Sequence, residues 1–168
     1  SKAGVARLLK EGESRAQLRD VERIKAQVAV LQELLPQVDT AKMVSTAPKL
    51  LTYSPETLAR KLQALQELLP EADWKKIVST QPSLLGRYPD EMARNLRQLR
   101  KLLPEADVVK MVSKHPPLLS RDPETLEHNL QALQELLPEL DAGTMVSIHP
   151  CLLTLDPEDA AKMVSKHP

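Results

Sequence analysis

Aromatic residues are almost absent from this sequence, and their scarcity limits both its core and its possible ligands. The 168 residues include one Trp, two Tyr and no Phe. The core must therefore be aliphatic, and it is built mostly from leucine. Proteins that recognise single-stranded nucleic acids usually stack the bases on aromatic side chains. If this chain binds a nucleic acid, its composition favours contacts to the backbone of a duplex or of a structured RNA.

Cysteine, glycine and long apolar runs are scarce as well. The single cysteine, Cys151, excludes an intramolecular disulfide framework. Four scattered glycines leave no Gly-rich loop that could cradle a phosphate. No apolar run approaches the roughly 20 residues that span a bilayer, so we expect no contact with a membrane.

A 34-residue repeat is the strongest signal in the sequence. The hexapeptide LQELLP occurs three times and MVSKHP twice. Prolines recur at the same spacing in three columns, which are Pro36, Pro70, Pro104 and Pro138, then Pro48, Pro82, Pro116 and Pro150, and then Pro55, Pro89, Pro123 and Pro157. Such a period predicts stacked units that share one core, because a single unit cannot bury its own apolar face.

Each unit is expected to contain two helices and a return segment. In the copy over 55–89, Ser54 caps the first helix and Pro55 occupies its first position. Pro70 opens the second helix and Pro82 ends it. After Pro82, two leucines fill the gap between helices. Leucines at steps of four, three and four form the buried face of the first helix, namely Leu58, Leu62, Leu65 and Leu69.

The domain organisation that follows is an all-α solenoid. We expect a helical lead-in over 1–20, about four tandem repeats over 21–157, and a partial repeat over 158–168. Pro150 and Pro168 are separated by 18 residues, which is 16 fewer than the period requires. The shortfall has two explanations: the tail is a degenerate terminal cap, or the body of one first helix is missing from the chain.

The order of motifs within the repeat resembles that of the mitochondrial transcription termination factor (mTERF) family. The matching text in the second unit runs from Glu71 to Val78 and then from Pro82 to Leu85. The chain departs from the family where a glycine usually follows the first helix, because it has Leu-Leu-Pro there. The resemblance implies a left-handed array of three-helix units in a mitochondrion or a chloroplast, with a basic groove that binds DNA or RNA. Tetratricopeptide repeats share the period but not the motifs.

Charge is distributed unevenly along a chain whose net charge is zero. Residues 1–123 carry 21 basic and 15 acidic side chains, a net charge of +6, whereas residues 124–157 contain six acids and no Lys or Arg. The acidic repeat would repel nucleic acid, so we expect it to act as a cap or to dock a basic protein.

Several basic residues share repeat positions or helix faces. Lys42, Lys76 and Lys110 occupy one repeat position, so stacking would align them as a ladder along a phosphate backbone. A solvated face is the alternative interpretation. The candidate nucleic-acid-binding residues are Lys42, Arg60, Lys61, Lys75, Lys76, Arg94, Arg97, Lys101, Lys110 and Lys114.

Catalysis and metal binding are not expected. His115, His149 and His167 share a repeat position, but stacked helices lie about 10 Å apart, which is too far for side chains to share a metal. The serines of the repeat lack a nucleophile motif and a paired base. We therefore expect no catalytic residue, no metal, no cofactor and no small-molecule substrate.

The function expected from these features is non-catalytic binding of nucleic acid in an organelle, with the mitochondrion favoured. Structured RNA is preferred, for example ribosomal RNA contacted by an accessory subunit of the organellar ribosome. The alternatives are a DNA-binding organellar transcription factor and a protein–protein interaction scaffold.

The leucine periodicity leads to a first test. The substitution Leu62→Ala should lower the free energy of unfolding by about 2–5 kcal/mol, because it removes buried methyl groups and leaves a cavity. Chemical denaturation measures this change. A loss below about 0.5 kcal/mol, far short of what a buried leucine costs, would place Leu62 outside the core.

Overall fold

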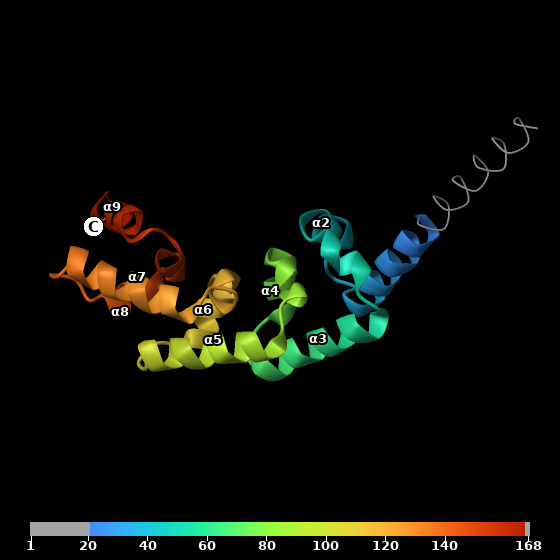
Figure 1. Ribbon diagram of the computed structural model, residues 1–168, viewed down its shortest axis with the longest axis horizontal. Coiled ribbons are helices and arrows are strands. Elements are labelled where there is room, and N and C mark those ends of the chain that lie inside the picture. Colours follow the sequence, from blue (N-terminus) through green and yellow to red (C-terminus); the bar gives the residue numbers. More distant parts are fainter. Residues whose placement is uncertain (1–20, 167–168) are drawn as a thin grey trace, which may run out of the picture. The chain divides into compact units, whose positions relative to one another are not determined.

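A computed structural model describes residues 21–166 of the chain (Figure 1). The chain forms two compact units, residues 1–59 and 60–168, and the boundary between them falls within helix α3. Each unit is described by itself. The predicted helical lead-in over 1–20 lies outside the described residues.

Every regular element in the described part of the chain is a helix, which confirms the predicted all-α repeat fold. Each repeat contains a long α-helix, a short α-helix and a 3₁₀ helix, as the family resemblance implied. The first unit contains a helix over 21–34, α2 (Thr40–Thr46), the 3₁₀ helix η1 (Pro48–Thr52) and the start of α3 (Pro55–Leu68). The second unit continues with α4 (Trp74–Thr80), η2 (Pro82–Gly86), α5 (Pro89–Leu102), α6 (Val108–Lys114), η3 (Pro116–Leu119), α7 (Pro123–Leu136), α8 (Ala142–Ile148), η4 (Pro150–Thr154) and α9 (Pro157–Lys166).

The long helices begin as their sequences predict. A proline occupies the first position, where the missing N–H costs no intrahelical hydrogen bond. The Ser54 hydroxyl accepts a hydrogen bond from the Thr57 N–H at 3.2 Å, and the Asp122 carboxylate accepts one from the Thr125 N–H at 3.2 Å. These side chains satisfy N–H groups that have no partner within the helix.

The short helices begin later than the sequence analysis placed them. Helix α4 starts at Trp74, so the expected start at Pro70 is wrong. Asp73 is the N-cap residue, and its side chain accepts a hydrogen bond from the Lys76 N–H at 3.1 Å. Asp39 and Asp107 cap α2 and α6 in the same way. An aspartate that binds the N–H group three residues ahead favours a cap over the interior of a helix, which fixes the start immediately after it.

The predicted leucine face forms the core. The most exposed of its four side chains is Leu62, at only 4%. The two leucines that follow Pro82, Leu84 and Leu85, are fully buried in η2, and Ile77 and Val78 of α4 are buried as well. The 3₁₀ helix therefore contributes core side chains and also returns the chain to the next long helix.

A side chain at one position of the long helix holds each 3₁₀ segment. Asn95 donates from Nδ2 to the carbonyl oxygens of Leu119 at 2.9 Å and Arg121 at 2.8 Å. Asn129 donates in the same way to Leu153 at 2.9 Å and Leu155 at 3.0 Å. We call this interaction the carbonyl clamp, and its members, each of which binds the carbonyl 26 residues later, are Gln27, Lys61, Asn95 and Asn129.

The clamp satisfies carbonyl groups that would otherwise lack a donor. The last carbonyls of a helical segment have no partner within that segment, and leaving one unpaired away from water is costly. Residue type varies at the clamp position, but each of the four side chains carries an N–H donor. Because the residue type varies, the sequence pattern did not reveal the clamp. Lys61 was predicted to bind nucleic acid, and Asn95 and Asn129 were not singled out.

The tail combines features of both helices of the repeat. Helix α9 is aligned with a first helix, because its Pro157 follows the proline column of Pro123. Ala160 occupies the position of the buried Leu126, is itself fully buried, and lies on a helix that packs against α7. The sequence of 159–168, however, matches that of 107–116, which includes the second helix α6.

Removing a clamp donor should destabilise the repeat. The substitution Asn129→Ala should lower the free energy of unfolding by about 1–3 kcal/mol, because two carbonyls lose their donor in a mostly buried site. The exposed neighbour His128→Ala is the control, and chemical denaturation measures both variants. Equal losses in the two variants would show that the clamp adds nothing.

Candidate nucleic-acid interface

Three of the predicted cations lie together on helix α5. Arg94, Arg97 and Lys101 line a hollow of about 410 Å³, and the start of α7 at Asp122–Glu124 closes its other side. The three side chains are spaced three and four residues apart, so they share one face of the helix. The structure thus brings together three of the candidate nucleic-acid-binding residues, and we call them the stripe.

Two further arginines extend this site. A second hollow, of about 160 Å³, is lined by Arg87, Arg94 and Arg121, and it shares Arg94 and Asp122 with the first. Arg87 and Arg121 were missed because they follow 3₁₀ helices and belong to no helical stripe, although they share one repeat position. We call the combined surface the basic groove, with the cations Arg87, Arg94, Arg97, Lys101 and Arg121.

Arg97 and Lys101 are unpaired at a place where other repeats pair their side chains. The equivalent residues of α3 are Gln63 and Glu67, which form a hydrogen bond of 2.9 Å. Those of α7 are Gln131 and Glu135, which form one of 3.1 Å. Within residues 21–166, neither Arg97 nor Lys101 forms an ion pair. Like charges four residues apart destabilise a helix, so α5 gives up a local interaction to present two cations.

Carboxylates also line the groove, but the cations outnumber them. Glu91, Asp122 and Glu124 face the same two hollows. Five cations and three carboxylates leave a net charge of +2. The Asp122 carboxylate is also engaged in capping α7. The groove therefore favours an anion with several charges that can contact several cations at once.

A model of the mTERF family matches residues 1–166 of the chain. The protein belongs to the mTERF family. Proteins of this family are non-catalytic helical-repeat proteins that bind nucleic acid in mitochondria or chloroplasts. No curated protein matches the sequence significantly. Family membership confirms the predicted resemblance and the predicted absence of catalysis.

Two lysines predicted to contact phosphate have partners in this mTERF protein. Lys61 is a member of the carbonyl clamp, and its ammonium group donates to the Arg87 carbonyl at 2.7 Å. The same group lies 5.5 Å from the centre of the Tyr88 ring. Lys114 Nζ lies 3.4 Å from the Ile148 carbonyl oxygen of the following repeat. Both side chains thus join segments of the fold.

The remaining predicted cations do not line the groove. Lys76 and Lys110 are exposed at matching positions near the starts of α4 and α6. Lys75 lies 5.7 Å from the centre of the Trp74 ring. Arg60 is exposed on α3, whereas Lys42 belongs to the first unit. The lysine ladder through Lys42 stays a prediction.

His115 connects the third and fourth repeats of the array. Its Nε2 lies 2.8 Å from the Thr154 hydroxyl oxygen, and the Arg121 guanidinium donates to the Thr154 carbonyl at 3.1 Å. Burial, reinforced by the positive charge of Arg121, holds the pKa of His115 below its ordinary value. Arg121, a cation of the basic groove, is therefore held in place where the third and fourth repeats meet.

Metal sites and membrane-spanning helices are two further kinds of feature that can carry function. Across the described residues, no three or more His, Cys, Asp and Glu side chains are placed to hold a metal ion. No helix in this part of the chain is long and apolar enough to cross a membrane.

The lowered pKa of His115 predicts a pH-dependent junction. As the pH falls through 6.5, the unfolded chain takes up a proton at this histidine before the folded chain does. Acid therefore favours unfolding, and stability rises again with pH. The substitution His115→Gln should remove this part of the pH dependence as the pH falls below 6.5. Denaturation curves across this range measure the effect, and identical pH profiles for wild type and His115→Gln would contradict it.

Proposed function

We propose that this mTERF protein binds structured RNA through the basic groove and contacts mainly the phosphate backbone. Arg97 and Lys101 carry the proposal, because the neighbouring long helices α3 and α7 each hold a hydrogen-bonded Gln–Glu pair at the same positions. A helix that keeps two cations side by side, with no ion pair to either of them among residues 21–166, is suited to an external anion. Neighbouring phosphates of a nucleic acid supply such an anion.

The dimensions of the stripe suit successive phosphates. From Arg94 to Lys101 the helix rises by about 10 Å. Nucleotides of one duplex strand advance by about 3.4 Å along the axis, so the stripe spans roughly three of them. Arg87 and Arg121 widen the contact beside this line.

Structured RNA is favoured over the other nucleic acids for two reasons. The near absence of aromatic side chains disfavours recognition of single strands by base stacking. The acidic repeat repels nucleic acid and confines it to one side of the array. A protein with one basic and one acidic surface is suited to touching RNA and protein together, as an accessory subunit of a ribosome does. The proposed ligand is ribosomal RNA of the mitochondrion, with the chloroplast as the alternative compartment.

The acidic repeat supports a second interaction. Residues 124–157 contain no Lys or Arg, and Glu124, Glu127 and Glu135 are exposed on α7. A basic protein would complement this surface. The competing functions for the whole chain are a DNA-binding transcription factor and a scaffold for proteins alone.

The Gln–Glu pair of the other repeats suggests the sharpest test. The double variant Arg97→Gln/Lys101→Glu gives α5 the pair found in α3 and α7, so it should fold at least as stably as the wild type. Affinity for a structured ribosomal RNA should fall at least tenfold. If five phosphates are contacted, the wild-type log–log salt slope should be about −4, and the variant should lose about 1.5 to 2 of it.

Fluorescence anisotropy at several salt concentrations measures these values for structured RNA, single-stranded RNA and duplex DNA. The matched single variants are Arg97→Gln, which alters the groove, and Arg100→Gln, which alters an exposed arginine of α5 outside it. Equal losses from both would reduce the groove to general charge attraction. Tighter binding to duplex DNA would favour the transcription factor, and salt-independent or absent binding would favour the scaffold.

The natural ligand can be identified by ultraviolet crosslinking in an organelle extract, followed by sequencing of the attached nucleic acid. Reads concentrated on one ribosomal RNA support the proposal. Reads concentrated on one DNA site contradict it.

A further inference from the structure

Three large apolar side chains of the fourth repeat are exposed. Leu136 at the end of α7 is 47% exposed, Leu140 in the following loop 38%, and Ile148 at the end of α8 54%. We call these three residues the open face. Their counterparts one repeat earlier are Leu102, Ala106 and Lys114.

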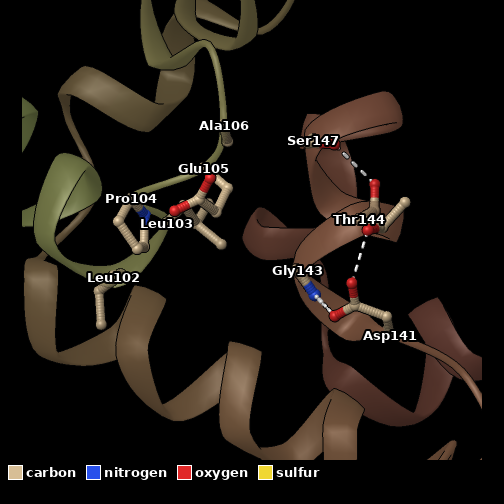
Figure 2. A pocket seen from close by; sticks show the side chains of 9 residues that line it. All are labelled: Leu102, Leu103, Pro104, Glu105, Ala106, Asp141, Gly143, Thr144 and Ser147. Atoms are coloured by element: carbon tan, nitrogen blue, oxygen red, sulfur yellow. Dashed lines mark hydrogen bonds between the residues drawn. The ribbon is translucent and has the colours of Figure 1, made fainter.

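The counterparts of the open face lie on the side of their repeat that faces the second helix of the following repeat. Leu102 and Ala106 line a hollow of about 210 Å³ whose other wall is formed by Asp141, Gly143 and other residues of the α8 segment (Figure 2). Lys114 reaches the Ile148 carbonyl at the end of α8. The open face therefore has the form of a docking surface for a short second helix that begins with a capping aspartate.

The tail of the chain has the sequence of such a helix. Residues 159–168 match 107–116 at eight of ten positions, and the two differences replace valine by alanine. The copy over 107–116 includes α6, in which Val108, Met111 and Val112 are all buried. In α9 the counterpart of Met111, Met163, is instead 50% exposed. On the apolar face of the tail, Ala160 is thus buried beside α7, Val164 is half-buried and Met163 stays exposed.

Too few residues separate the tail from η4 for the tail to dock as a second helix on the open face of its own molecule. In the preceding repeat a first helix of 14 residues separates the 3₁₀ helix from the second helix, and it carries the chain about 20 Å. Only residues 155–158 lie between η4 and Asp159, and four extended residues span at most about 14 Å. Relative to a full repeat, the tail lacks 16 residues, which is the length of the body of a first helix.

Charge also favours this match. Asp159, Lys162 and Lys166 give the tail segment a net charge of +1, and both lysines are exposed. The repeat that carries the open face has six acids and no basic residue over 124–157. A second copy of the chain can therefore supply a helix that has the sequence of a second helix and a charge opposite to that of the acidic repeat.

We propose that the tail helix of a second copy leaves its own α7 and docks on the open face as the second helix of a fifth repeat. Ala160, Met163 and Val164 then take the buried positions that Val108, Met111 and Val112 have in α6. Because each copy has one tail and one open face, reciprocal docking closes a two-fold dimer. This dimer does not depend on the proposed binding of RNA.

Analytical ultracentrifugation of the full chain over a range of concentrations tests the proposal. Wild type should form a dimer as concentration rises. Met163→Asp, which alters the tail, and Leu140→Asp, which alters the open face, should each raise the dissociation constant at least tenfold. Tyr88→Asp is the matched control, because it replaces a 70% exposed apolar residue of another repeat and should leave the dimer unchanged.

Mixing the two defective variants provides a second measurement. The Met163→Asp copy keeps an intact open face and the Leu140→Asp copy keeps an intact tail, so the mixture should dimerise more strongly than either variant alone. A chain that stays monomeric at every concentration overturns the proposal and makes a basic protein the better occupant of the open face. A dimer that both substitutions leave intact, or a mixture without restored dimerisation, overturns it as well.

Discussion

The carbonyl clamp is the interaction on which the repeat architecture depends. Each repeat returns its chain through a 3₁₀ helix that supplies core leucines, so the segment cannot move into solvent to hydrate its last carbonyls. A donor from the long helix 26 residues earlier satisfies them instead. The requirement is for an N–H donor of suitable reach, which glutamine, lysine and asparagine all meet. The clamp therefore fixes the return segment against its own long helix while the residue type varies.

The proposed binding site lies where one repeat departs from its neighbours. On the surface of α3 and of α7, a glutamine and a glutamate form a hydrogen bond, whereas α5 carries Arg97 and Lys101 at the equivalent positions. Arg121 belongs to the same groove, and its guanidinium also binds the fourth repeat at Thr154. The basic groove is thus tied to the junction with the acidic repeat. Nucleic acid is the ligand class of the family, and the basic groove is the surface on which we propose that this chain binds it.

The tail shows how one sequence can suit two positions. Its apolar residues at 160 and 164 fit beside α7, whereas those at 160, 163 and 164 fit a second-helix position such as that of α6. The 16-residue shortfall decides between them within one molecule, because a helix without the preceding long helix starts too close to η4. The tail matches the open face but cannot reach the one on its own molecule. It is therefore suited to exchange between two copies of the chain.

The sequence alone determined the 34-residue period, the all-helical class, the family and the buried leucine face, because these depend on spacing along the chain and on turns of single helices. It also predicted Arg94, Arg97 and Lys101 as candidate cations, and the structure places them together in one hollow. It did not locate the start of α4, since Pro70 and Asp73 are both competent start signals and only the observed Asp73 cap chooses between them. Only the tertiary structure engaged Lys61 in the clamp and brought Arg87 and Arg121 to the groove. The clamp joins Lys61 to a carbonyl 26 positions later, and the groove brings the segments after two 3₁₀ helices to α5, so both depend on how helices pack.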